Sequence, residues 1–141
     1  MISFRHCAAK GLQVGDSFTI TRCFTEEDIR LFAKFSGDYS SVHFDASDAQ
    51  IFHFKTPIPH GLTATPINEI GGQIGWMALS MTLHYTDPVY VGDAITCRWV
   101  IKEVDETGHA MAAITITNEV GDTVLEAETT GVVSGVVERK V

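Results

Sequence analysis

The sequence has few cysteines and no long hydrophobic run, and each shortage argues against a class of protein. Its three cysteines, Cys7, Cys23 and Cys97, form no Cys-x-x-Cys pair and leave one over. A disulfide framework or a zinc site is therefore not expected, and we predict reduced, mostly buried thiols. The apolar runs are far too short to cross a bilayer, so a transmembrane protein is not expected either.

Positive charge is scarce as well. The chain has ten Lys and Arg residues and 18 Asp and Glu residues, which gives a formal net charge of -8. The basic residues are scattered from Arg5 to Lys140, whereas phosphate recognition needs a local cluster, so we expect no nucleic-acid partner. Arg5, His6 and Lys10 precede no apolar segment, which argues against a signal peptide. We therefore predict a cytoplasmic protein without a membrane partner.

The composition is that of a globular domain. The 141 residues are 45% hydrophobic and 20% charged. A chain of this length typically forms one domain that buries roughly two-thirds of its unfolded surface. We expect a single domain over residues 1–141, without internal repeats.

The first half of the chain predicts a strand and a short helix. Polar and apolar residues alternate over 17–23, as in a half-buried strand. Thr25 precedes three acids and is typical of a helix N-cap, and Gly37 is typical of the end of that helix. Residues 38–59 show no long period, so we expect loops around a short helix near 46–52.

A second, buried helix is predicted over 61–78. Its apolar positions recur at helical spacing, at Ile67, Ile70, Ile74 and Met77. Pro66 is tolerated only in a first helical turn, so we place the N-cap at Thr63 or Thr65.

After this helix, apolar and polar residues alternate with a period of two residues, which is typical of strands. Alternating segments occur at 79–85, 95–101, 110–118 and 123–133, separated by Gly, Asp and Pro turn signals. We expect the last three strands to form an antiparallel meander. The order of elements predicts an α+β domain in which a curved antiparallel sheet wraps around a long central helix. An exposed edge of this sheet would pair with a second copy, so we expect a homodimer.

Asp38 and His43 form a candidate acid–base pair just beyond the first helix. Imidazole titrates near neutral pH, and a carboxylate beside it can orient it or bind a water molecule. The alternative is a loop-capping carboxylate and a half-buried structural histidine. A metal site at the other histidines is not expected, because no ligand spacing such as His-x-x-x-His is present.

Five short motifs follow one another in a fixed order. They are Gly15-Asp16, Phe24-Thr25-Glu26-Glu27-Asp28-Ile29, Ser36-Gly37-Asp38 with His43 following, Ile58-Pro59-His60-Gly61 and Pro88-Val89-Tyr90-Val91-Gly92-Asp93. With this set the sequence resembles the MaoC-like dehydratases, also called the (R)-specific enoyl-CoA hydratase family. The resemblance covers most of the chain and implies the hot-dog fold.

The resemblance implies a hydratase or dehydratase. The family adds water to trans-2-enoyl thioesters, or removes it from 3-hydroxyacyl thioesters, without a metal or redox cofactor. Its catalytic aspartate and histidine match Asp38 and His43. The Gly61 backbone N–H, beside His60, would donate to the thioester carbonyl oxygen, since the start of a helix offers unpaired N–H groups. The substrate would be carried by coenzyme A or by acyl carrier protein.

The sequence departs from the family pattern within the catalytic loop. Ser40-Ser41 stands where the family has Asn-Pro, which removes a fixed φ angle and an amide side chain. Some relatives also carry a pocket serine nine positions after the histidine of the His-Gly pair, where this chain has Glu69. Glu69 would contact a polar acyl group or transfer a proton there; the alternative is a structural hydrogen bond.

Two other functions remain open at this point. A thioesterase of the same fold would direct water at the carbonyl carbon and release free thiol. A catalytically silent acyl-thioester binder or partner subunit would bind substrate without turnover, as the change at Ser40-Ser41 allows.

Overall fold

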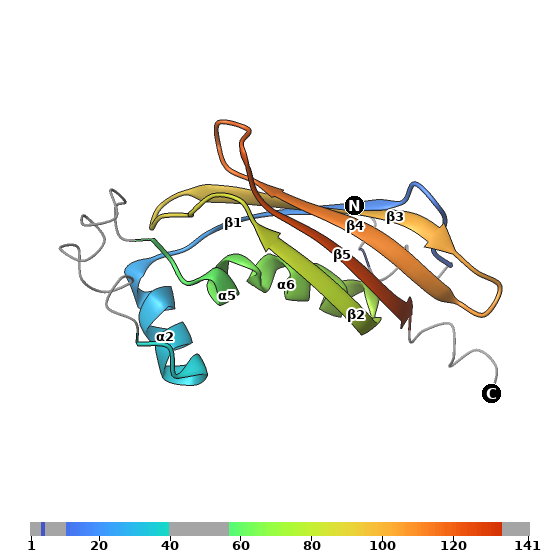
Figure 1. The fold of residues 1–141 in the computed structure, drawn as a ribbon, viewed down its shortest axis with the longest axis horizontal. Coiled ribbons are helices and arrows are strands. Elements are labelled where there is room, and N and C mark those ends of the chain that lie inside the picture. The colour runs from blue at the N-terminus through green and yellow to red at the C-terminus, as the bar shows by residue number, and fades with distance from the viewer. Residues whose placement is uncertain (1–3, 5–10, 40–56, 134–141) are drawn as a thin grey trace.

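The structure is a computed structural model that describes residues 4, 11–39 and 57–133. The helices and strands are β1 (Ser17–Cys23), α2 (Glu26–Ser36), α5 (His60–Thr63), α6 (Thr65–Ile74), β2 (Trp76–Tyr85), β3 (Ala94–Val104), β4 (His109–Thr117) and β5 (Thr123–Val133). They are arranged as a curved sheet with helices on its concave side (Figure 1).

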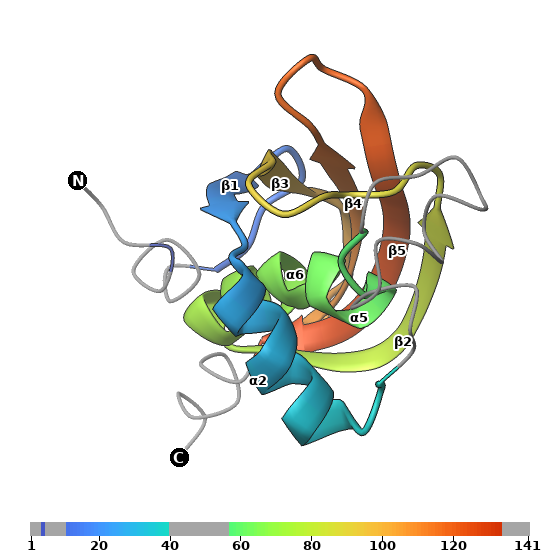
Figure 2. The same ribbon diagram turned by 90° about the vertical axis from the view of Figure 1, so that its left-hand side faces the viewer.

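The five strands form one antiparallel sheet in the order β1-β3-β4-β5-β2. The predicted meander is confirmed, because β3, β4 and β5 are neighbours in the order of the sequence. Helix α6 lies inside the curve of the sheet, which bends around it (Figure 2). The α+β prediction, a curved sheet around a central helix, is therefore confirmed.

Alternation along the strands creates the core. Fully buried side chains come from one face of the sheet and one stripe of α6, namely Ile67, Ile70, Ile74, Ile95, Cys97, Trp99, Ile101, Ile114, Ile116 and Leu125. Burying each large apolar side chain contributes about 1.5–3 kcal/mol, so this layer is the main source of stability. Trp99 packs edge to face against Trp76, with ring centroids 5.2 Å apart.

The first helix begins and ends where the sequence predicts. The Thr25 hydroxyl accepts from the Asp28 N–H, and the Asp28 carboxylate accepts from the Thr25 N–H. This reciprocal capping box satisfies two otherwise unpaired donors. Gly37 ends the helix with a φ of 78°, in the left-handed region that favours glycine.

The predicted central helix differs from the observed one at both ends. It is divided into α5 and α6, begins at His60 and ends at Ile74. Neither Thr63 nor Thr65 is its N-cap: the Thr65 hydroxyl donates to the Leu62 carbonyl at 2.7 Å instead.

Met77 was wrongly placed in this helix. Its side chain is 59% exposed, on β2. The helix stops because Gly75 adopts a φ of 75°, although the helical spacing of apolar residues continues from Ile74 to Met77.

The cysteines differ from one another in burial. Cys97 is buried. Its burial, and to a smaller extent the negative charge of Glu69, raises the pKa of its thiol to about 12. Cys23 is exposed, contrary to the expectation of mostly buried thiols, and Cys7 lies outside the described residues. None of the described helices has the length and apolar character that a membrane span requires.

Candidate active site

Asp38 is placed by the end of α2. It follows the left-handed residue Gly37, and its backbone N–H donates to the Ser36 hydroxyl at 3.1 Å. The Asp38 side chain is half-buried. Its predicted partner His43 lies outside the described residues, as do Ser40 and Ser41, so the acid–base pair stays a prediction.

The segment that leads into α5 is held by a distant part of the chain. The Ile58 N–H donates to the Val89 carbonyl at 2.8 Å, and Pro57 forms an antiparallel bridge with Tyr90. Ile58 and Val89 are both buried. Two of the motifs noticed in the sequence, Ile58-Pro59-His60-Gly61 and Pro88 to Asp93, are therefore one structural unit.

The same unit also contacts the start of α2. The Gly92 N–H donates to the Phe24 carbonyl at 3.0 Å, and the Asp93 carboxylate accepts from the Tyr90 N–H at 3.0 Å. Gly92 has a φ of 88°, which favours glycine in this turn. The turn thus connects the two chain segments that carry Asp38 and Gly61.

Gly61 lies in the first turn of α5. The Leu62 and Thr63 N–H groups both donate to the Pro59 carbonyl, at 3.0 and 3.1 Å. No group of the described residues accepts from the Gly61 N–H, and the residue is exposed. This N–H is therefore available to an oxygen atom of a ligand.

Phe32 of α2 lies directly against Gly61. A Cβ atom added to Gly61 would lie 2.5 Å from Phe32 Cζ, a separation that real Cβ contacts do not show. A side chain at position 61 would therefore require the Phe32 ring to shift. Figure 1 shows α2 and α5 at the same end of the molecule.

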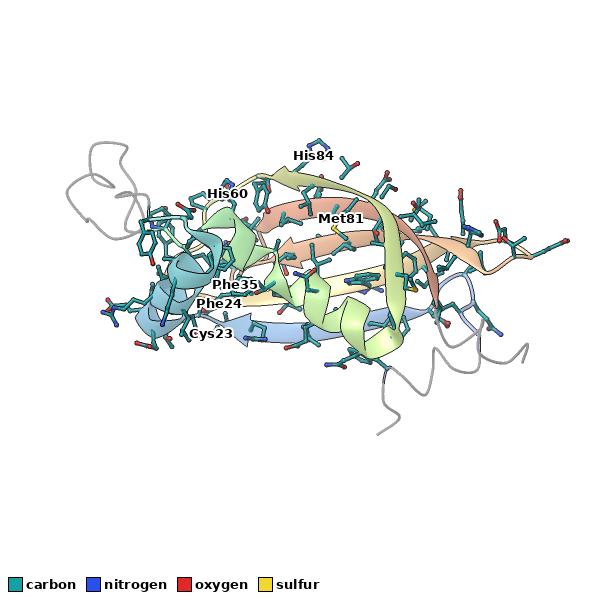
Figure 3. The ribbon with its side chains drawn as sticks, turned by 90° about the horizontal axis from the view of Figure 1, so that it is seen from below. Cys23, Phe24, Phe35, His60, Met81 and His84 are labelled. Carbon is teal, nitrogen blue, oxygen red and sulfur yellow. The ribbon has the colours of Figure 1, made fainter. Side chains whose placement is uncertain are left out.

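Tyr85 contacts His60, the residue that precedes Gly61. The two rings are stacked, with centroids 4.1 Å apart and an interplanar angle of 11°. Tyr85 is the last residue of β2, and burial raises the pKa of its phenol above the ordinary value. Figure 3 labels His60 at this end of the molecule.

Glu69 contacts β1. Its Oε1 lies 2.6 Å from Arg22 Nη1, and the side chains are 33% and 41% exposed respectively. The Arg22 guanidinium also lies over the Phe24 ring, 5.5 Å from its centroid. This contact matches the structural role considered for Glu69, while a role toward an acyl group stays a prediction.

Two residues of this region had no place in the predicted site. They are Phe32, on α2, and Tyr85, at the end of β2, and no sequence signal brings either to α5. The described residues contain no group of three or more His, Cys, Asp or Glu side chains that could hold a metal ion.

Comparison with known proteins gives a consistent result. The model of the MaoC-like domain family matches residues 11–124. A mitochondrial 3-hydroxyacyl-[acyl-carrier-protein] dehydratase of Arabidopsis thaliana is 36% identical over 97 residues, which are 66% of this chain and 58% of the relative. An (R)-specific enoyl-CoA hydratase of Aeromonas caviae is 30% identical over 104 residues, 70% of this chain and 78% of the relative.

Solved structures show the same architecture. The (R)-hydratase of A. caviae superimposes with a TM-score of 0.82 at 23% identity, over 88% of this chain and 98% of that protein. An R-hydratase of Pseudomonas aeruginosa has a TM-score of 0.81 at 26% identity, over 94% and 85% respectively. The chain spans little more than half the length of the Arabidopsis relative. With the family model matched from residue 11 to residue 124, this chain belongs to the MaoC-like domain family and has its hot-dog fold.

Proposed function

We propose that this protein is a hydratase or dehydratase that adds water to 2-enoyl thioesters or removes it from 3-hydroxyacyl thioesters. The observation that carries the proposal is the family match over residues 11–124, which contains Asp38, His43 and Gly61. The relatives in the comparisons are named as hydratases and dehydratases of such thioesters. Gly61 is exposed and its N–H has no acceptor among the described residues, which supports the same chemistry.

In the proposed mechanism, Asp38 and His43 hold one water molecule between them. One group takes a proton from this water as its oxygen attacks C3, and the other delivers a proton to C2. Elimination follows the same path in reverse, so one pair serves both directions without a change of oxidation state. The Gly61 N–H donates to the thioester oxygen, where negative charge develops; one such donor contributes about 2.7–4 kcal/mol to transition-state stabilisation.

The neighbouring residues would bind the substrate. Ser40 and Ser41 would supply hydroxyl groups shortly before His43 in the sequence, and His60 precedes the N–H donor. The acyl group would be carried by coenzyme A or by acyl carrier protein, the two carriers named for the relatives.

A homodimer is the proposed assembly. β2 is an edge strand, and it carries four exposed apolar side chains, Met77, Leu79, Met81 and Leu83. Unpaired N–H and C=O groups at such an edge are satisfied when a second copy continues the sheet. Met81 is labelled in Figure 3 on this edge strand.

The function is tested by following the loss of enoyl-thioester absorbance with short, long and polar acyl chains on both carriers. We expect turnover by the wild-type protein and a loss of at least about 100-fold in Asp38→Asn and His43→Ala, since general acid–base groups contribute that much. Both variants should keep the wild-type circular dichroism spectrum. Wild-type turnover in either variant would remove that residue from the mechanism. Release of free thiol would indicate a thioesterase, and analogue binding without turnover a silent binder.

A further inference from the structure

The turn that carries the Gly61 N–H is held between two aromatic side chains from different elements. The Phe32 ring of α2 occupies the space that a Cβ on Gly61 would need, and the Tyr85 ring at the end of β2 stacks on His60. We propose that Phe32 and Tyr85 are positioning residues that hold the Gly61 N–H in the direction of the thioester oxygen. This inference rests on the proposed function of Gly61.

Phe32 limits movement of the turn toward α2. Because a Cβ on Gly61 would lie 2.5 Å from Phe32 Cζ, the Gly61 backbone has no free space on that side. Phe32 is itself partly buried and packs against the core. It also belongs to the helix that ends just before Asp38, so one helix sets the position of both proposed groups.

Tyr85 limits rotation of the turn from the side of the sheet. Its ring is nearly parallel to His60, at 11° and 4.1 Å between centroids. Tyr85 is paired with Leu125 of β5, and the next residue, Thr86, donates its N–H to the Val124 carbonyl at 3.0 Å. The Tyr85 ring therefore extends from backbone that is paired with β5.

The remaining support comes from the backbone. The Ile58 N–H bond to the Val89 carbonyl anchors the chain just before Pro59. The Leu62 and Thr63 N–H bonds to the Pro59 carbonyl then close the first turn of α5, and the two rings contact this turn from outside the backbone. An N–H donor acts on a developing charge only within a narrow geometry, and a displacement of about 1 Å costs on the order of 100-fold in rate.

This role predicts a specific kinetic pattern. A donor that acts on charge formed in the transition state contributes to kcat and hardly to KM. Tyr85→Leu and Phe32→Leu should each lower kcat by about tenfold or more, with KM within about twofold of wild type. Tyr85→Phe keeps the stacked ring and should stay within about twofold of wild-type kcat.

Phe18→Leu provides the matched control. Phe18 is a buried aromatic residue of β1 that pairs with Trp99 of β3 and packs edge to face on Phe4. The control should lower the melting temperature as Phe32→Leu does while leaving kcat unchanged at temperatures where both proteins are folded. If kcat falls as much in Phe18→Leu as in Phe32→Leu, the rings act through stability alone and the proposal is wrong. If Tyr85→Phe is as slow as Tyr85→Leu, the hydroxyl group and not the ring is responsible, and the proposal is wrong for Tyr85.

A second measurement separates this proposal from the proposed function. The ¹⁵N relaxation order parameter of the Gly61 amide reports its rigidity without substrate. It should fall in Tyr85→Leu and Phe32→Leu but not in Tyr85→Phe or Phe18→Leu, and an unchanged value in both leucine variants would overturn the positioning role. If wild-type protein turns over no thioester while this pattern is observed, the proposed function fails and the restraint of the turn stands.

Discussion

At the scale of single residues, the Arg22–Glu69 ion pair joins β1 to the central helix. Both side chains are partly exposed, at 41% and 33%, so water and salt screen the pair. We expect a double-mutant cycle with Arg22→Gln and Glu69→Gln, followed by urea unfolding, to give a coupling free energy of about 0.2–1 kcal/mol that decreases at high salt.

The same Glu69→Gln variant distinguishes a structural role from a role toward the acyl group. If Glu69 only holds α6 on β1, the variant keeps wild-type kcat and KM. Glu106→Gln, an exposed carboxylate in the turn between β3 and β4, is the control for loss of one charge. A drop in kcat in Glu69→Gln but not in Glu106→Gln would place Glu69 in the proposed proton transfer.

At the scale of the element, the end of α2 decides where Asp38 lies. Gly37 has a φ of 78°, and a Cβ added there would meet nothing within 4 Å, so the cost of Gly37→Ala is conformational. We expect this variant to lower the free energy of unfolding by about 1–2 kcal/mol. Because Asp38 is the next residue, kcat should also fall, and Gly37→Asn should recover part of both losses.

Gly72→Ala is the matched control for that substitution. Gly72 lies within α6, is exposed, and also leaves open space around an added Cβ. There alanine should raise the free energy of unfolding by about 0.5–1 kcal/mol, because glycine disfavours a helix interior. If both glycines responded alike in denaturant unfolding, the left-handed backbone would not be the cause at Gly37.

At the scale of the whole molecule, the exposed edge strand β2 predicts the assembly. Leu79 and Met77 are 62% and 59% exposed, which is unfavourable for a monomer in water. We expect light scattering at micromolar concentration to give twice the chain mass of 15.4 kDa for wild type, and the single mass for Leu79→Lys. Val14→Lys, also at an exposed apolar residue but before β1, should leave the dimer intact. A wild-type monomer would contradict the dimer proposal.

Much of the fold follows from local chemistry. Alternation over 17–23 and 123–133 predicted β1 and β5 with their observed bounds, because side chains of a strand point to opposite faces. Thr25 and Gly37 predicted both ends of α2, because a capping side chain and a left-handed glycine act on the adjacent residues. Met77 was misplaced because it lies three residues after Ile74, as in a helix, and also two residues before Leu79, as in a strand. The conformation of Gly75 decides between the two.

The sequence by itself determined the order of the elements, the curved α+β architecture and the family motifs, because these depend on neighbouring residues. Only the tertiary structure decided that Val89 anchors Ile58, that Phe32 lies on Gly61 and that Glu69 pairs with Arg22. Each of these contacts joins residues far apart in the chain, on elements whose register and approach depend on packing around the common core. The position of the proposed N–H donor is therefore a property of the folded sheet and helices together.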